Sequence, residues 1–415
     1  MEAIALPPIA GIEPIPAHVP RELVRPFPYI LGATTKARPH SFIKEIHEGP
    51  DVFWAERVFN GVSGAWVPRR AEDMQRVYHD AEHYTTRGLA PFATLVGDSW
   101  HFVPFEAEPP MHSLLRGAIN PLFTPKRMAA LDDKMRLYAR ESIAAFRDRG
   151  ACEFMSEFAF EFPIKVFLEL MGLPQDRVQQ FLAWEHGLIH EHDIEKIKQA
   201  TRAVAACMRE EIADRRANPR DDFITYGIQA EVDGRKFNDD ELVGFCFNLF
   251  LGGLDTVSSS MGMQFLHLAE RPDHQAILRA RPEIIPDAID EMLRAYAPVG
   301  SARECIKETR IGDITVKPGD KVHLATFLAT HDPAHLANPE EVILDRKTRH
   351  FAFGHGPHLC LGMHLARREL RIAMEEVLAG LPEFGLKPGA EIEYYLAITI
   401  QPIELPLVWN VTAPR

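Results

Sequence analysis

A short loop near the C-terminus places one cysteine at the start of a helix. Residues 351–362 read FAFGHGPHLCLG, so two glycines and a proline precede Cys360 and Gly362 follows it. From Met363 the sequence changes to good helix formers with an apolar face. Glycine and proline let a loop bring its backbone close to a flat neighbour, and a helix N-terminus lowers the pKa of a nearby cysteine. We therefore expect Cys360 to be a thiolate held in a tight loop.

Three interpretations of this loop are open. A thiolate can be the axial ligand of haem iron, where it favours cleavage of the O–O bond. The loop can also cap a helix around a buried, purely structural cysteine. The third interpretation is zinc, because His355, His358, Cys360 and His364 are close in sequence. Against zinc, His364 lies one turn into the predicted helix and the chain has no Cys-x-x-Cys pair.

The long apolar stretch at 238–270 predicts a single helix. Asn238 followed by Glu241 is typical of a capping box, and Pro272 ends the helical pattern. At about 1.5 Å per residue the helix is on the order of 48 Å long, enough to cross a whole domain.

The middle of this helix contains Gly252-Gly253-Leu254-Asp255-Thr256. Each glycine in a helix interior costs about 0.5–1 kcal/mol relative to alanine. Either the glycines make room for a bulky neighbour, or the helix is distorted for a purpose. A threonine hydroxyl can bond the carbonyl four residues earlier, so we expect Thr256 to bond Gly252 and open the helix there.

Two charged pairs stand at helical spacing. Glu291 and Arg294 are three residues apart, and His112 and Arg116 are four apart, so each pair shares a helix face. An exposed ion pair contributes less than about 1 kcal/mol, whereas breaking a buried one costs about 3–5 kcal/mol. The importance of each pair therefore depends on its burial.

Together these motifs resemble the cytochrome P450 superfamily. The spacing of Phe353, Gly356, His358, Cys360 and Gly362 is similar to that of its haem-binding loop. The Gly-Gly-x-Asp-Thr stretch is similar to the oxygen-activating segment of the camphor-hydroxylating bacterial members. The resemblance runs from about residue 15 to the C-terminus.

This resemblance implies a cytochrome P450 fold, mainly α with a small β portion, in which the long central helix crosses haem b. Cys360 would be the axial ligand of the iron, with Phe353 and Gly354 in the same loop. Thr256 would stabilise the activated oxygen by hydrogen bonding. Asp255 would relay protons from solvent, a task that needs an ionisable group in a dry pocket.

The resemblance also assigns charged residues. His112, Arg116, Arg303 and His358 match positions that bind the two haem propionates. Glu291 and Arg294 match a pair buried beneath the haem and joined to a basic residue before the cysteine loop. Arg346 is the candidate for that third member, although it stands one position from the usual register.

Composition and pattern indicate one large soluble domain over residues 1–415. The chain is 46% hydrophobic and 25% charged, as in ordinary globular proteins, and no linker or repeat divides it. Residues 1–40 are proline-rich and are expected to be irregular coil. A hairpin is expected at 51–70, and strands at 310–328 and 392–409.

Charge and cysteine content narrow the functional class. A net charge of −13 disfavours nucleic acid or an anionic membrane as the partner. Five scattered cysteines favour a reducing compartment. The N-terminus lacks a signal peptide, and we identify no stretch with the roughly 20 apolar residues of a membrane span. We expect a cytoplasmic, soluble protein.

The substrate pocket is where the chain departs from the camphor-hydroxylating members. Trp100 stands where they have a tyrosine that donates to the camphor ketone, and Asn248 stands where they have leucine. Ser301 replaces an aspartate beside Arg303. The expected pocket walls are Phe92, Trp100, Phe105, Asn248, Leu251, Gly252, Val299, Ile398 and Thr399. Such walls suit a small, mostly hydrocarbon substrate, and favour a terpenoid or norisoprenoid such as cineole or an ionone over camphor.

Electrons must come from another protein, because the sequence shows no dinucleotide fingerprint and no iron–sulfur spacing. The resemblance implies a [2Fe-2S] ferredoxin reduced by an NADH-dependent flavoprotein. The candidate docking patch is basic: Arg76, Arg116, Lys347, Arg349 and Arg367.

The leading hypothesis is a monooxygenase that uses O2 and two electrons to hydroxylate its substrate. A peroxide-driven peroxygenase would use the same fold, but Asp255 and Thr256 favour oxygen activation. A non-catalytic haem-thiolate sensor and a zinc hydrolase are the alternatives from other classes.

Overall fold

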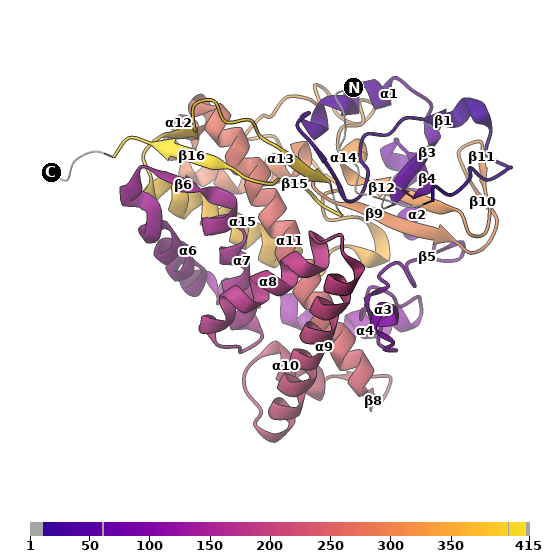
Figure 1. Ribbon diagram of the computed structural model, residues 1–415, viewed down its shortest axis with the longest axis horizontal. Helices are drawn as coiled ribbons and strands as arrows, with labels where there is room; N and C mark the ends of the chain where they lie inside the picture. Colours follow the sequence, from indigo (N-terminus) through magenta and orange to yellow (C-terminus); the bar gives the residue numbers. More distant parts are fainter. Residues whose placement is uncertain (1–10, 60–61, 397, 412–415) are drawn as a thin grey trace.

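One helix, α11 (Asp239–Glu270), crosses the middle of the computed structural model, which describes residues 11–59, 62–396 and 398–411 (Figure 1). It begins with the predicted capping box: the Asn238 side chain accepts from the Glu241 backbone N–H, and the Glu241 carboxylate accepts from the Asn238 N–H. α11 packs against α7 (Glu161–Leu170), α9 (Ile194–Ala217) and α15 (Met363–Gly380). The predicted helix is therefore present.

By length and composition α11 could cross a membrane. The expectation that no stretch of the chain is long and apolar enough for a membrane span was therefore wrong. The most apolar 18-residue stretch of α11 is 67% buried inside the molecule. The apolar residues of α11 therefore belong to the protein core.

Shorter helices precede and follow α11 in the chain. In chain order they are α1 (Ile43–His47), α2 (Ala71–His79), α3 (Phe92–Val96), α4 (Met111–Ile119), α5 (Pro125–Ala129), α6 (Asp132–Phe146), α8 (Val178–Ile189), α10 (Phe223–Gln229), α12 (Pro272–Ala280), α13 (Ile285–Ala295) and α14 (Thr326–Ala329). A π-helical turn, Met155–Ala159, precedes α7. α15 packs against α6 and α13, and so carries the segment after Cys360 into the core.

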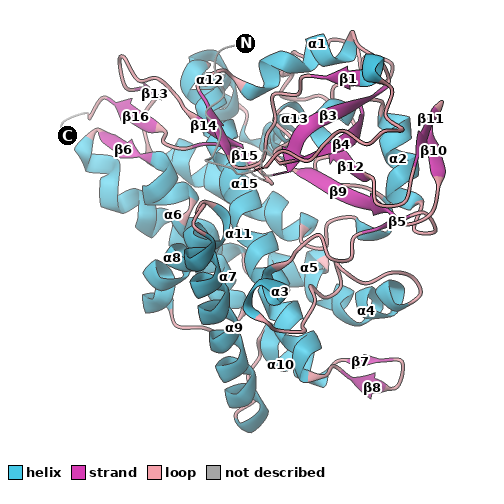
Figure 2. Cartoon of the chain, turned by 45° about the vertical axis from the view of Figure 1, so that its right-hand side comes forward, coloured by secondary structure: helices cyan, strands magenta, loops and turns pink. Residues whose placement is uncertain are grey.

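The strands of the largest sheet gather on one side of the molecule, at the upper right of Figure 2. The largest sheet has the order β1-β3-β4-β12-β9-β5, with β1 parallel to β3 and β12 parallel to β4. Its strands are β1 (Val24–Arg25), β3 (Val52–Phe59), β4 (Ser63–Pro68), β5 (Tyr84–Thr85), β9 (Gly300–Cys305) and β12 (Lys321–Ala325). β3 and β4 form the predicted hairpin.

Small sheets complete the β portion. Their strands are β2 (Ala33–Thr35), β6 (Ala151–Glu153), β7 (Glu231–Val232), β8 (Arg235–Lys236), β10 (Thr309–Ile311), β11 (Ile314–Val316), β13 (Phe384–Leu386), β14 (Tyr394–Leu396), β15 (Ile400–Pro402) and β16 (Pro406–Trp409). The strands expected at 310–328 and 392–409 are present. Of the residues that the structure describes, 51% are helical and about 15% are in strands, so the predicted fold class is confirmed.

The proline-rich N-terminal segment is more ordered than predicted. Residues 1–10 of this segment lie outside the described residues. Within 11–40, β1 pairs with β3 and β2 pairs with β14. Between turns, short 3-10 helices and irregular backbone, residues 11–40 therefore also contain two short strands that pair with strands later in the chain.

Candidate functional site

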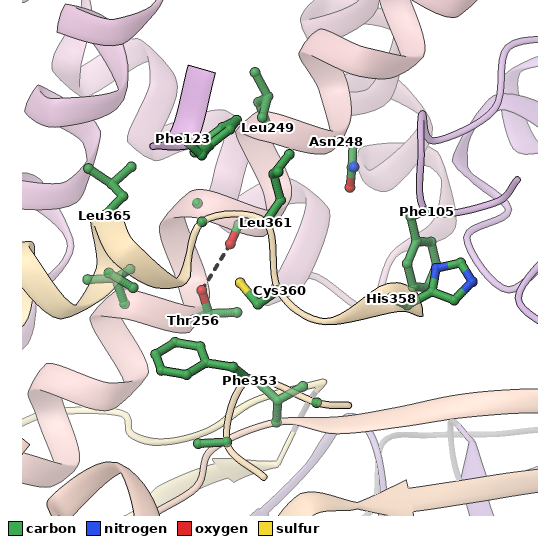
Figure 3. Close-up of a pocket in the computed structure, with 18 of the residues that line it drawn as sticks. Phe105, Phe123, Asn248, Leu249, Thr256, Phe353, His358, Cys360, Leu361 and Leu365 are labelled. Atoms are coloured by element: carbon green, nitrogen blue, oxygen red, sulfur yellow. Dashed lines mark hydrogen bonds between the residues drawn. The ribbon is translucent and has the colours of Figure 1, made fainter. Parts of the chain in front are cut away.

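A cavity of about 340 Å³ lies between α11, the loop before α15 and the end of β9. Its walls include Cys360 from the loop, Thr256 from α11 and Arg303 from β9. Most of the remaining walls are apolar, including Phe123, Phe167 and Leu249. Figure 3 shows Cys360, Thr256, Phe353 and Asn248 around the same space (Figure 3).

The cysteine loop is held by its own backbone. The Cys360 N–H donates to the Phe353 carbonyl at 2.9 Å, closing the loop over a short 3-10 turn, Gly356–His358. Gly356 has φ +69°, and a Cβ atom there would lie 2.8 Å from the Tyr78 carbonyl oxygen, so the loop passes too close to α2 for a side chain. Phe353, Gly354 and Cys360 all line the cavity.

The surroundings of Cys360 act on the pKa of its thiol in opposite directions. Burial raises the pKa of the Cys360 thiol, while the Gly362 backbone N–H, Arg116 and Arg367 lower it by less. The backbone N–H at the helix N-terminus therefore acts on the thiol in the predicted direction, but the loss of solvation outweighs it. A coordinating thiol is deprotonated by the metal that it binds.

The middle of α11 faces the cavity through Gly252, Gly253 and Thr256. The Thr256 hydroxyl donates to the Gly252 carbonyl at 3.0 Å, as predicted from the sequence, and this bond is the dashed line in Figure 3. A Cβ atom at Gly252 or Gly253 would meet nothing within 4 Å. The glycines therefore leave open space beside Thr256, and no neighbouring protein group fills it.

Asp255 points away from the cavity and is not among its lining residues. Its carboxylate accepts from Thr399 Oγ1 and from Gln401 Nε2 at 2.8 Å, and lies 3.3 Å from His190 Nε2. Burial alone would raise the pKa of Asp255, but the bonds from His190, Thr399 and Gln401 outweigh it and hold the pKa below its ordinary value. Asp255 is thus an ionised carboxylate on the side of α11 that faces the loop between α8 and α9.

The comparisons with known proteins identify this arrangement. Residues 24–388 match the family model described as cytochrome P450. The chain belongs to the cytochrome P450 family. It is 36% identical over 383 residues to "Probable cytochrome P450 127A1" of Sinorhizobium fredii, covering 91% of this chain and 92% of the relative. It is also 31% identical to "Cytochrome P450-terp" of a Pseudomonas species, covering 90% and 93% of the two chains.

Solved cytochrome P450 structures are also similar to this chain. The crystal structure of cytochrome P450 CYP101C1 is similar with a TM-score of 0.85 and 32% identity, covering 95% of this chain and all of the other. The CYP101J2 structure gives a TM-score of 0.86 at 28% identity, covering 96% and 100%. The predicted P450 resemblance is confirmed, and with it a monooxygenase whose cofactor is a haem iron.

The cavity fits a haem. Of the five cysteines, Cys360 is the one that lines it. His112, Arg116, Arg303 and His358 converge on one end, and the rings of His112 and His358 are 4.2 Å apart.

These four residues form an electrostatically unbalanced group. Burial and then the nearby arginines lower the pKa of His358 to about 3. Burial also lowers the pKa of both arginines. His112 Nε2 and His358 Nδ1 are buried without a hydrogen-bond partner. Buried cations and orphaned donors at one end of a cavity are what two propionates require.

The zinc alternative has no support in the described part of the chain. There, the group of histidine, cysteine and carboxylate ligand atoms close enough to share a metal is Glu185, His190 and Asp255, which excludes Cys360. His355 bonds His79 instead, with 2.8 Å between the ring nitrogens.

The predicted Glu–Arg network is deeply buried. Glu291 and Arg294 on α13 are 1% and 0% exposed. The Glu291 carboxylate accepts from Arg294 Nε at 2.8 Å and from Arg346 Nε at 3.1 Å. The two arginines also donate to backbone carbonyls in the 330–341 segment. The structure therefore places Arg346 as the third member, and the network ties α13 to the chain that leads into the cysteine loop.

The predicted pocket walls divide into two groups. Phe105, Asn248, Gly252 and Val299 line the cavity. Outside its lining are Phe92, Trp100, Leu251, Ile398 and Thr399. Ile398 is 51% exposed, and the Thr399 hydroxyl is bonded to Asp255.

Trp100 does not donate into the cavity. Its indole N–H donates to Asp98 at 2.9 Å, and its ring packs against Phe102 and Phe247. The prediction that it replaces the substrate-binding tyrosine was therefore wrong for this structure, because a carboxylate two residues away takes the donor.

Asn248 on α11 is a polar residue of the cavity wall. Its Nδ2 donates to the Val103 carbonyl at 3.1 Å. Because a carbonyl can only accept, this bond fixes which end of the amide faces Val103. Figure 3 shows the amide oxygen directed toward the side that holds Cys360 and His358. The amide oxygen of Asn248 is thus a hydrogen-bond acceptor in the cavity wall.

Tyr78 and Glu369 are polar lining residues that sequence reasoning missed. The Tyr78 hydroxyl lies 2.8 Å from Ser301 Oγ, and the ring lies beneath the Arg303 guanidinium. Glu369 on α15 is fully buried, its Oε2 has no partner, and burial raises its pKa well above the ordinary value. Glu369 lies nine residues after Cys360 on a predicted helix, a local signal that could have drawn attention to it.

The basic patch is partly neutralised. Arg116 lines the cavity and does not join a surface patch. Arg76 and Lys347 are exposed but paired with acidic neighbours, Asp73 and Asp287. Arg367 pairs with Asp290 and stacks on the Phe353 ring. Arg349 is exposed.

Proposed function

We propose that this P450 binds haem b through Cys360 and hydroxylates a small terpenoid or norisoprenoid in the cytoplasm. It uses O2 and electrons from a [2Fe-2S] ferredoxin that an NADH-dependent flavoprotein reduces. The observation that carries the proposal is the mostly apolar cavity that both Cys360 and Thr256 line. When bound, the haem supplies oxygen activation and the transfer of one oxygen atom to a C–H bond.

The residues around the cavity have separate tasks. Cys360 holds the iron, and the cluster of His112, Arg116, Arg303 and His358 binds the propionates. Thr256 hydrogen-bonds the reacting oxygen from α11, using a hydroxyl that now donates to Gly252. Asp255 relays the proton that this chemistry consumes. Because its carboxyl group faces away from the cavity, its side chain must rotate to deliver that proton.

The walls support a substrate that is mostly hydrocarbon with one polar group. Apolar and aromatic side chains surround most of the cavity, and a small number of polar groups fix orientation in such sites. Asn248 presents its oxygen, so a substrate hydroxyl can donate to it. We therefore propose a terpene alcohol in preference to a ketone such as camphor.

The haem assignment is tested with the reduced, CO-bound protein. Wild type should show the strongly red-shifted Soret band of a thiolate-ligated haem, and Cys360→Ser should abolish it. Cys246→Ser is the matched control, because Cys246 is buried on α11 and does not line the cavity. If Cys246→Ser removed the band and Cys360→Ser kept it, the assignment would be wrong.

The substrate class is tested by a spin-state titration of the ferric protein. Borneol and camphor form a matched pair, because they share a skeleton and differ in hydroxyl against ketone. One hydrogen bond contributes about 0.5–1.5 kcal/mol, so borneol should bind roughly 2- to 10-fold more tightly. Cineole and an ionone extend the series to other skeletons. Equal or tighter binding of camphor would contradict the role given to Asn248.

A further inference from the structure

Three ionisable side chains form a buried group beside α11. His190 Nε2 lies 3.3 Å from Asp255 Oδ1 and 3.5 Å from Glu185 Oε1. Glu185 and Asp255 are 4% and 3% exposed, whereas the His190 side chain is 12% exposed. The imidazole therefore connects two buried carboxylates to the molecular surface.

The position of His190 gives it access to solvent. It follows the last residue of α8, in the short segment before α9 begins at Ile194. Within the described residues, no hydrogen bond is seen at its Nδ1, while Nε2 faces both carboxylates. One ring nitrogen thus faces Asp255, and the other is left for water.

The surroundings keep this imidazole charged. The titratable groups that face it are Glu185 and His186 from α8, Asp255 from α11 and Tyr395 from β14. Burial alone would lower the pKa of His190, but Asp255 and Glu185 raise it to about 10. A proton is therefore stored next to Asp255 at neutral pH.

We propose that His190 supplies Asp255 with protons from solvent and that Glu185 orients the ring for this transfer. In the step, the His190 Nε2–H bond breaks and an Asp255 O–H bond forms, with no electron transferred. The neutral ring keeps its Nδ1 proton, and rotation of the ring returns a protonated nitrogen to Asp255. The bare nitrogen then takes its next proton from water.

The transfer also releases Asp255. Before it, a charged imidazole and a carboxylate attract each other, and after it both groups are neutral. The charge that held the Asp255 side chain on the α8 side of α11 is then gone, so the protonated carboxyl group can rotate toward Thr256. The inference rests on the proposed function, because it supplies the proton that the hydroxylation consumes.

The test uses the haem-loaded enzyme with its ferredoxin and reductase, and borneol as the probe substrate. His190→Gln removes the titrating group, and the borneol-supported rate of NADH oxidation should fall at least tenfold. Its solvent isotope effect in D2O should rise, because proton supply becomes limiting. Borneol affinity from the spin-state titration should stay within twofold. His192→Gln, an exposed change two residues away, should leave all three unchanged.

His190→Arg separates proton supply from charge pairing. Arginine can pair with both carboxylates but stays protonated in proteins, so this variant should fold, bind borneol and remain slow. A wild-type rate and isotope effect in His190→Arg would overturn the relay, because charge pairing alone would then suffice. If wild type itself oxidised no NADH with borneol, the proposed function would fail together with the relay.

Discussion

Replacing Glu291 by glutamine should destabilise the protein far more than replacing an exposed carboxylate of the same type. Glu291 accepts from Arg294 Nε and Nη2 at 2.8 and 3.0 Å, from Arg346 Nε at 3.1 Å and from the Ile343 N–H at 3.0 Å. A neutral amide has one acceptor oxygen, and its NH2 group would face guanidinium donors. Arg294, 0% exposed, would then be a buried charge without a counterion.

The magnitude follows from this burial. Breaking a buried ion pair by removing one partner costs about 3–5 kcal/mol. Unfolding entropy is about 2.1 cal/mol/K per residue, or roughly 0.9 kcal/mol/K for 415 residues. The Tm of Glu291→Gln should therefore fall by about 3–6 °C. Loss of the Soret band should come first on heating, because the arginines anchor the segment that leads into the cysteine loop.

The matched control is Asp313→Asn. Asp313 pairs with Arg310 three residues away, the same separation as between Glu291 and Arg294, but the two side chains are 106% and 62% exposed. Such a pair contributes less than about 1 kcal/mol, so the Tm should move by about 1 °C or less. The assay is thermal denaturation at one scan rate, followed by far-UV circular dichroism and Soret absorbance. Equal Tm shifts in the two variants would refute the structural role of the network.

Three further predictions concern the cavity and the docking surface. Glu369→Gln should raise the Tm more at pH 8 than at pH 5. The folded-state pKa of Glu369 lies well above its ordinary 4.5, so the stability of the wild type falls as the pH rises from 4.5 through the folded-state pKa. The same gain in Tm at both pH values would contradict this. Asn248→Leu should remove the preference for borneol over camphor in the spin-state titration, and an unchanged ratio would contradict the role of its oxygen. Ferredoxin-supported turnover should weaken as salt rises, and more steeply in wild type than in Lys347→Gln; a rate insensitive to salt would exclude the basic patch.

The cysteine loop, the start of α11 and the Glu291–Arg294 pair could be predicted from sequence because the motifs that encode them are local. The glycines and the proline around Cys360 encode the loop, and the capping box starts α11 within four residues. Glu291 and Arg294 pair across one helical turn. Each of these contacts joins residues that are close in the chain, so spacing alone predicts the geometry.

The walls of the substrate pocket could not be predicted in the same way. The orientation of Trp100 depends on Phe247, almost 150 residues away, as well as on Asp98. One error was avoidable: adjacent residues in an extended segment point to opposite faces, so Ile398 and Thr399 could not both line one wall. His190 belongs to no motif, and only the fold brings it to Asp255.

The division between the two sides of α11 separates substrate binding from proton supply. Asp255 and Thr256 are neighbours in the chain, but successive helical residues are about 100° apart around the axis. Thr256 accordingly lines the cavity, while Asp255 is held by His190, Thr399 and Gln401 on another side. Groups that hold Asp255 can slow or speed its protonation without touching the substrate. Changes at Asn248 should therefore alter substrate affinity at a constant rate of proton supply, and changes at His190 should alter the rate of proton supply at constant affinity.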